Sequence, residues 1–285
     1  MLRADNYMGF ARTTSVVLAR LVFVLFIGVS VASVAQFELP VMSVRGAAMG
    51  GTSVALDDAA SSLCNIAALA RRSGYGAALS YRNDFMMAAT SHKWVAVYGS
   101  LTPTGTVIAT YHHYGGKTYN EQRLSAGYAQ AVGSNISIGA TMDYLYSGVS
   151  DGYYDAVRAL TFTASMQFAL GRSWTMGARV SNPAAVKAGS DRLPVVLNIG
   201  TAWQTTADLL TTIEIEKTIY SPATLRAGAE YCFLNHFAAR VGIVTHPVEY
   251  CFGVGANYGR YGIDLSVAVH QLLGITSQIG LSASF

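Results

Sequence analysis

Charged side chains make up only 12% of this chain, so those that recur in a regular pattern are the first candidates for chemistry. Arg226 and Glu230 lie four residues apart, and Arg240 and Asp264 follow in later apolar segments. If these segments are β-strands, alternate residues share a face and all these charges point to the same side. They could select solutes inside a pore. Because buried charges are normally paired, we expect instead a charge-paired ladder that braces a barrel wall or holds an inner segment.

Other groups that could catalyse a reaction or bind a metal are sparse. His112 and His113 are adjacent in an expected outer loop, without the further converging ligands that a metal site needs. The expected strands bring together no grouping of Ser, His and carboxylate. The three cysteines, Cys64, Cys232 and Cys251, lack the paired spacing of a disulfide framework or a zinc site. We therefore expect a protein that is not an enzyme and holds no cofactor or metal.

The elements that position these residues are expected to be membrane strands. The chain is 52% hydrophobic, yet beyond residue 35 it lacks the run of about 20 apolar residues that a membrane helix needs. Apolar residues interleaved with small polar ones are typical of a barrel wall between lipid and lumen. We predict an all-β fold, a transmembrane antiparallel up-and-down β-barrel of about 14 strands. The expected strands are residues 75–82, 93–101, 105–112, 119–130, 135–146, 157–170, 173–182, 193–204, 208–218, 223–234, 236–245, 248–258, 261–270 and 277–285.

The alternation of apolar and polar residues is clearest in the last third of the chain. In residues 261–270, Ile263 and Leu265 share one face and Asp264 lies on the other. A soluble β-sandwich also alternates, but its outward face would carry many Lys and Glu residues, whereas this face carries Ser, Thr and Gly. The apolar face of the final run, which we predict to be the membrane-insertion signal, comprises Ile279, Leu281 and Phe285.

Residues 1–35 have the organisation of a cleavable signal peptide. Three arginines precede or begin an apolar stretch from Leu21 to Val34, and the small residues Ser33 and Ala35 suit cleavage before Gln36. A retained membrane anchor is the alternative, but the stretch is short for a span. Removing residues 1–35 takes away three of the 19 basic and one of the 16 acidic residues and lowers the formal net charge from +3 to +1. No basic surface for nucleic acid is then expected.

Residues 36–73 differ in character from the rest of the chain. They are rich in Gly, Ala, Ser and Met and too irregular for a membrane strand, so we expect a hatch or plug inside a barrel formed by residues 74–285. Glycines recur on the expected lumen face, where they would leave room either for this segment or for a substrate tunnel. These glycines are Gly127, Gly139, Gly177, Gly200, Gly228, Gly242, Gly253, Gly255 and Gly280.

Of the two uses for that room, we favour packing of residues 36–73. A polar wall without side chains at many positions leaves unpaired hydrogen-bonding groups, and buried polar groups are rarely left unsatisfied. We therefore expect Asn65 and either Asp57 or Asp58 to hydrogen-bond to wall groups such as Arg226 or Arg240.

The same segment carries a recognisable motif. It reads R-G-A-A-M-G-G-T from residue 45, then V-A-L-D-D-A, then N-I-A-A-L. This resembles the N-terminal motif of FadL-like outer-membrane barrels, especially their PorV/PorQ branch, which ends in N-P-A-G-L; here Ile66 and Ala68 replace the Pro and the Gly. The runs L-R-A-G-A-E-Y at 225–231 and A-R-V-G at 239–242 are similar too. The hatch-motif residues are Arg45, Gly46, Met49, Gly50, Gly51, Asp57, Asp58, Asn65 and Leu69.

The resemblance implies a barrel of about 14 strands with an N-terminal hatch in the lumen. FadL resembles a carrier of long-chain fatty acids, and the PorV branch resembles accessory barrels of the type IX secretion machinery of Bacteroidetes. We expect a non-enzymatic outer-membrane barrel that is an accessory or structural subunit of a protein export or assembly complex. Its expected partners are outer-membrane lipid, proteins of that complex and, during insertion, the barrel assembly machinery. The alternative is a FadL-like passive channel for hydrophobic small molecules.

Overall fold

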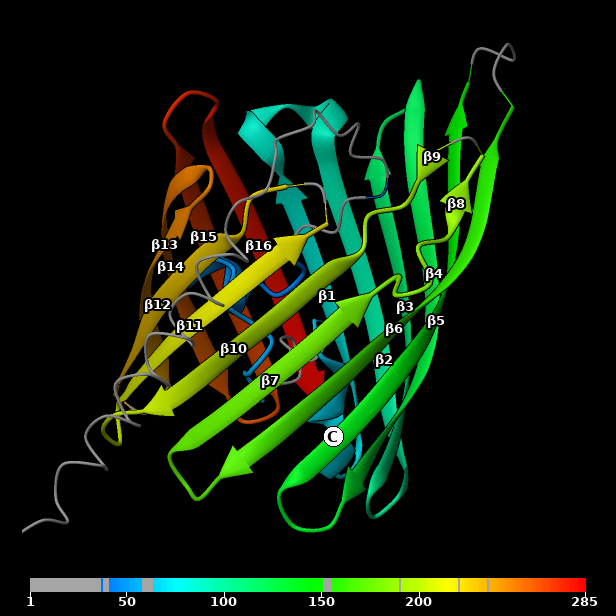
Figure 1. The fold of residues 1–285 in the computed structure, drawn as a ribbon. Helices are drawn as coiled ribbons and strands as arrows, with labels where there is room; N and C mark the ends of the chain where they lie inside the picture. The colour runs from blue at the N-terminus through cyan, green and yellow to red at the C-terminus, as the bar shows by residue number, and fades with distance from the viewer. Residues whose placement is uncertain are drawn as a thin grey trace, which may run out of the picture.

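The computed structural model describes residues 37, 41–57, 64–150, 155–189, 191–219, 221–234 and 236–285. Fourteen of its strands close into one antiparallel barrel, and β8 and β9 pair as a separate hairpin (Figure 1). The predicted fold class is therefore confirmed. The expected signal peptide, residues 1–35, and the expected motif residue Asp58 lie outside the described residues. In the part of the chain that the structure describes, no helix is long and apolar enough to cross a membrane.

The barrel strands follow the chain in order, each hydrogen-bonded to the one before it except where the β8–β9 hairpin intervenes between β7 and β10. With the two strands of the hairpin included, the bounds are β1 Tyr75–Asn83, β2 Ser91–Thr102, β3 Gly105–Gly115, β4 Tyr119–Val132, β5 Ile136–Val149, β6 Val157–Leu170, β7 Trp174–Ser181, β8 Lys187–Ala188, β9 Asp191–Arg192, β10 Val196–Gln204, β11 Leu209–Thr218, β12 Thr224–Phe233, β13 Phe237–Thr245, β14 Val248–Tyr258, β15 Tyr261–His270 and β16 Gly274–Ser284.

The barrel closes where the last strand pairs with the first. β16 runs antiparallel to β1, with Gly76 opposite Ser284 and Asn83 opposite Ser277. The terminal residue Phe285 continues this seam, because its backbone exchanges hydrogen bonds of 3.0 and 2.7 Å with Tyr75 and their rings stack at 5.4 Å. A closed barrel leaves no unpaired strand edge in lipid, which is the condition for crossing a membrane with strands.

Side chains alternate between the two faces of the wall as the sequence predicts. On β15, Leu265 and Val267 are 45% and 40% exposed on the outer face, whereas Ser266 is 5% exposed on the lumen face. The outer face of the other strands is likewise apolar, with members such as Leu225, Ile243 and Phe252. This belt of large apolar residues around the barrel is the surface that lipid covers.

The two ends of the barrel differ in their connections. At the end we call the turn end, strands join through short turns such as residues 133–135 and 259–260. At the opposite end, the loop end, the connections include residues 84–90 and 182–195, and Figure 1 shows the C-terminus at the turn end. Both the start of β1 and the end of β16 lie at the turn end because the number of barrel strands is even.

The structure corrects the predicted strands at the loop end. The run 193–204 becomes a strand only from Val196, because Pro194 has no N–H to donate to a neighbour. Residues before it form the β8–β9 hairpin, in which Lys187 pairs with Arg192. His112 and His113 belong to β3 rather than to an outer loop.

The apolar belt yields a mutational prediction. Leu265→Arg, in the middle of β15, is expected to cost about 2–4 kcal/mol of folding free energy or to block assembly, since a charge would then face lipid. Ala268→Arg is the matched control, because Ala268 lies on the lumen face of the same strand beside a cavity. Heat-modifiable migration of the folded barrel on gels measures both. Equal loss of folded protein in the two variants would contradict the assignment of faces.

Candidate functional site in the barrel lumen

Residues 41–57 and 64–73, which we call the inner segment, lie within the barrel (Figure 1, blue). Its α-helix α2, Val44–Ala48, packs against β13 to β16, and its 3-10 helix η2, Ile66–Arg71, packs against β3 to β6. Two further short 3-10 helices, η3 Asp84–Met86 and η4 Ala88–Thr90, lie in the β1–β2 connection at the loop end. The inner segment therefore touches opposite sides of the wall.

Polar side chains begin both helices of the inner segment. Ser43 caps α2 by accepting a 3.0 Å hydrogen bond from the Gly46 N–H. Asn65 caps η2 by accepting a 3.1 Å bond from the Ala67 N–H, and its amide donates to the carbonyls of Val54 and Met166. Because Ser43 and Asn65 are fully buried, these bonds satisfy groups that water cannot reach.

The lumen-facing glycines make room for the inner segment, as predicted. A Cβ added at Gly253 would lie 2.5 Å from the Ala48 Cβ, and one at Gly139 would lie 2.7 Å from the Ile66 side chain, both closer than atoms can pack. The wall glycines that meet the inner segment in this way are Gly127, Gly139, Gly177, Gly200, Gly228, Gly242, Gly253 and Gly280. Gly255 differs: a Cβ there would lie 2.6 Å from the Arg240 guanidinium, so it makes room for an ion pair of the wall.

The predicted lumen charges form a paired network around Glu230. Arg45 of α2 binds Glu230 through two hydrogen bonds, of 2.8 Å from Nε and 2.6 Å from Nη2. Arg240 donates to Glu230 at 2.5 Å and to Asp264 at 2.6 Å. The Arg240 and Glu230 side chains are 2% and 5% exposed, so these charges depend on one another for solvation. The network both braces neighbouring strands and ties α2 to the wall.

Arg226 belongs to a second group of wall residues. It donates to Glu216 at 2.7 Å, and Asn198 donates to both Glu216 and Glu214 at 2.9 Å. Glu214 in turn accepts the backbone N–H groups of residues 53 and 54 at 2.7 and 2.9 Å. The wall thus supplies acceptors to the inner segment from β11 as well as from β12.

Asn65 bonds to the barrel wall as expected, through the Met166 carbonyl of β6, but neither Asn65 nor Asp57 has Arg226 or Arg240 as a partner; the alternative residue Asp58 lies outside the described residues. Asn65 bonds to backbone groups, and the Asp57 side chain is exposed while its carbonyl accepts from Arg72. The reason is that Arg226 and Arg240 are already paired with acids of the wall itself. The structure accounts for other motif residues through packing and backbone conformation. Met49 and Leu69 are fully buried, and Gly50 and Gly51 have φ of 75° and 85°, which favours glycine.

Two groups of interior residues were missed in the sequence. Glu214 and Glu216 occupy alternate positions of an expected strand, so the same rule of alternation could have placed them in the lumen. Arg123 pairs with Asp143 at 2.9 Å on β4 and β5, at positions where that rule also applies. That Arg226, Glu230, Arg240 and Asp264 select solutes, the less favoured alternative from the sequence, is not tested by the structure.

His112 lies in a cluster of rings on the lumen face. Its Nε2 is 3.0 Å from Nδ1 of His92, and its ring stacks on Trp94 at 4.6 Å. His92 Nε2 in turn lies 3.1 Å from the Asp84 carboxylate of η3. Burial disfavours the charged Asp84 carboxylate, but the hydrogen bond with His92 and the charge of Arg82 outweigh it and hold the pKa of Asp84 below its ordinary value. Within the described ranges, no three His, Cys, Asp or Glu residues converge as a metal site would require.

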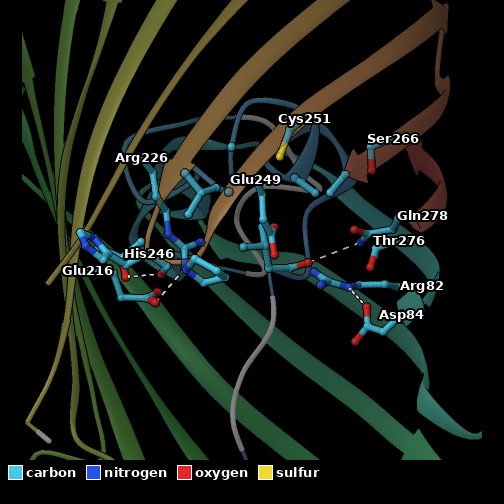
Figure 2. Close-up of a pocket in the computed structure, with 18 of the residues that line it drawn as sticks. Arg82, Asp84, Glu216, Arg226, His246, Glu249, Cys251, Ser266, Thr276 and Gln278 are labelled. Atoms are coloured by element: carbon cyan, nitrogen blue, oxygen red, sulfur yellow. Dashed lines mark hydrogen bonds and ion pairs between the residues drawn. The ribbon is translucent and has the colours of Figure 1, made fainter. Parts of the chain in front are cut away.

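A cavity of about 510 Å³ occupies the loop end of the lumen, and we call it the loop-end cavity. The inner segment forms its floor through Val41, Ala47, Gly50 and Gly51. Its walls carry charged residues from strands on opposite sides of the barrel, and Figure 2 shows Arg226 and Glu216 on one side and Arg82 and Asp84 on the other. A second cavity of about 40 Å³ lies beside Met42 and Ile66 of the inner segment. A solute entering at the loop end therefore meets the inner segment.

Solved structures share this fold at low sequence identity. The toluene transporter TodX of Pseudomonas putida is 13% identical, with a TM-score of 0.65 over 87% of this chain and 99% of that one. CymD, a monoaromatic hydrocarbon channel, is 11% identical, with a TM-score of 0.65 over 88% and 99%. A FadL homologue of Pseudomonas aeruginosa is 13% identical, with a TM-score of 0.65 over 88% and 99%. No protein-family model and no curated protein sequence matches the chain.

These comparisons correct the expected function. The solved barrels that share the fold are described as hydrocarbon channels, so the expectation of an accessory subunit of a type IX-like export complex was wrong. They are channels rather than enzymes, which agrees with the expectation of a non-enzymatic protein. The narrower resemblance to the PorV/PorQ branch stays a prediction. What the likeness shows is that the chain has the FadL-like barrel fold.

Proposed function

We propose that this protein is a passive channel of the outer membrane for hydrophobic and amphipathic small molecules. The observation that carries the proposal is the FadL-like barrel itself, which the chain shares over almost the full length of hydrocarbon channels. The loop-end cavity supports it by offering a solute an entrance into the lumen. Movement down a concentration gradient needs neither a cofactor nor a catalytic group.

The proposed location is the outer membrane, with the loop end facing outward. The apolar belt supports a lipid environment, and bacterial outer-membrane barrels place short turns on the periplasmic side and longer loops outside. In this proposal residues 1–35 are removed during export. The barrel assembly machinery inserts the remaining chain through its last strand, with Ile279, Leu281 and Phe285 on the lipid-facing side.

The inner segment is proposed to act as the hatch of the channel. It lies between the loop-end cavity and the turn end, where Arg71 donates to the carbonyls of Gly133 and Ile136. A solute that passes through the lumen must therefore displace part of this segment or follow a path beside it. The wall charges bound to it, Glu214 and Glu230, set how firmly it is held.

Uptake by intact cells tests the proposal. The protein is produced in a Gram-negative host without FadL-type channels, and initial uptake of labelled toluene and of a long-chain fatty acid is measured. We expect faster entry of at least one of these solutes than in cells that carry an unrelated outer-membrane barrel at the same level. Equal rates in both strains for every solute would overturn the channel function.

A further inference from the structure

The loop-end cavity has an excess of negative charge. Among its lining residues are four carboxylates, of Asp84, Glu121, Glu216 and Glu249, and two guanidinium groups, so its formal charge is −2 when the histidines are neutral. The guanidinium groups are both engaged: Arg82 lies 2.5 Å from Asp84 and Arg226 lies 2.7 Å from Glu216. The two remaining carboxylates carry the net charge.

These two carboxylates have no cationic partner among the described residues. Glu121 accepts hydrogen bonds from the Tyr119 hydroxyl at 2.5 Å and from the Phe37 N–H at 3.3 Å, both neutral donors. The Glu249 carboxylate has no hydrogen bond or ion pair within the described part of the chain, and Figure 2 shows Glu249 between the Arg226–Glu216 and Arg82–Asp84 pairs. Its carboxylate is therefore available to a solute in the cavity.

Other groups of the lining match a solute that donates hydrogen bonds. The side chain of Gln278 is only 4% exposed, yet its Oε1 has no donor among the described residues. Figure 2 shows Gln278 directed into the cavity from β16, beside Thr276. The rings of Phe85 and Tyr114 also line the cavity. Aromatic faces together with carboxylates are the chemistry that recognises ammonium groups, whereas an anionic solute would be repelled.

We propose that the loop-end cavity selects small amphipathic molecules that carry an ammonium group, which it holds through Glu249 and the neighbouring acceptors. This proposal rests on the channel function proposed above and names its substrate class. The apolar part of such a solute would contact Val41, Val244 and Ala268, which lie in the same lining. Solutes that carry a carboxylate, including free fatty acids, are excluded by the same charge.

Uptake into vesicles tests whether the cavity prefers cationic solutes over neutral and anionic ones. The mature chain is reconstituted into liposomes, and entry of labelled choline, neutral erythritol and anionic 3-hydroxybutyrate is measured at low ionic strength. We expect choline to enter fastest and 3-hydroxybutyrate slowest. Glu249→Gln should slow choline by about fivefold, the effect of losing one charge about 4 Å from a cation in water. The rate for erythritol should not change.

Asp155→Asn is the matched control, because Asp155 is exposed in a loop-end connection and does not line the cavity. It should leave the choline rate unchanged.

In the wild-type protein, added KCl should reduce the preference for choline, since salt screens the cavity charge. This measurement does not depend on the folding of any variant. The ammonium proposal is overturned, and the channel stands, if erythritol enters as fast as choline. The same conclusion follows if Glu249→Gln leaves the entry rate of choline unchanged. If none of the three solutes enters, the ammonium proposal is overturned, and uptake of toluene by intact cells decides separately on the channel function.

Discussion

Replacement of Glu230 by leucine is expected to lower the free energy of unfolding by about 3–5 kcal/mol, the cost of removing one partner from a buried charge network. The Glu230 carboxylate accepts three hydrogen bonds, two from Arg45 and one from Arg240. Leucine would leave these guanidinium groups without the carboxylate that lies between them. Arg240 would keep Asp264, but its side chain is 2% exposed and water cannot replace the lost acceptor.

Urea unfolding of the barrel in lipid vesicles, followed by tryptophan fluorescence, measures this loss. Glu249→Gln is the matched control, because Glu249 has no partner among the described residues, and its effect should stay within about 0.5 kcal/mol. A similar small effect of Glu230→Leu would show that the network does not stabilise the fold. Arg45→Met then separates the two roles of Glu230, because Arg45 belongs to α2 and ties that helix to Glu230.

The membrane wall is the part of this protein that its sequence predicts best. Lipid on one side and a polar lumen on the other impose a strict alternation, so the faces of residues such as Leu265 and Asp264 follow from their positions. The same rule placed Arg226, Glu230, Arg240 and Asp264 in the lumen, where the structure has them. It also applied to Glu214 and Glu216, which were overlooked although their spacing carries the same signal.

The pairing of interior residues does not follow from alternation. Whether Arg226 bonds to Asn65 or to Glu216 depends on the register of neighbouring strands and on the path of the inner segment. Either side chain offers an oxygen acceptor to the guanidinium, although only Glu216 also balances its charge, and the three-dimensional arrangement decides which of the two lies within reach. The β8–β9 hairpin was missed for a related reason, since loops at the loop end are not under the constraint of lipid.

A disulfide between α2 and β16 is expected to abolish the transport proposed here. A Cβ at Gly280 would lie 3.3 Å from the Val44 Cβ, and disulfides span about 3.5–4.5 Å, so a shift of a few tenths of an ångström lets Val44→Cys bond to Gly280→Cys. The native Cys64, Cys232 and Cys251 are replaced by alanine to prevent other pairings. The bond would fix the floor of the loop-end cavity to the wall.

If solutes pass through the lumen by displacing the inner segment, uptake in the doubly substituted protein should fall to the level of cells without the channel, and reductant should restore it. The variants with only Val44→Cys or only Gly280→Cys, treated with the same oxidant, control for the substitutions themselves. Thiol titration before and after reduction verifies the bond.

Uptake that stays unchanged in the cross-linked protein would mean that the inner segment need not move at α2. The solute would then leave the cavity through the barrel wall or beside the segment, and the hatch role of residues 36–73 would be rejected while the channel function stands.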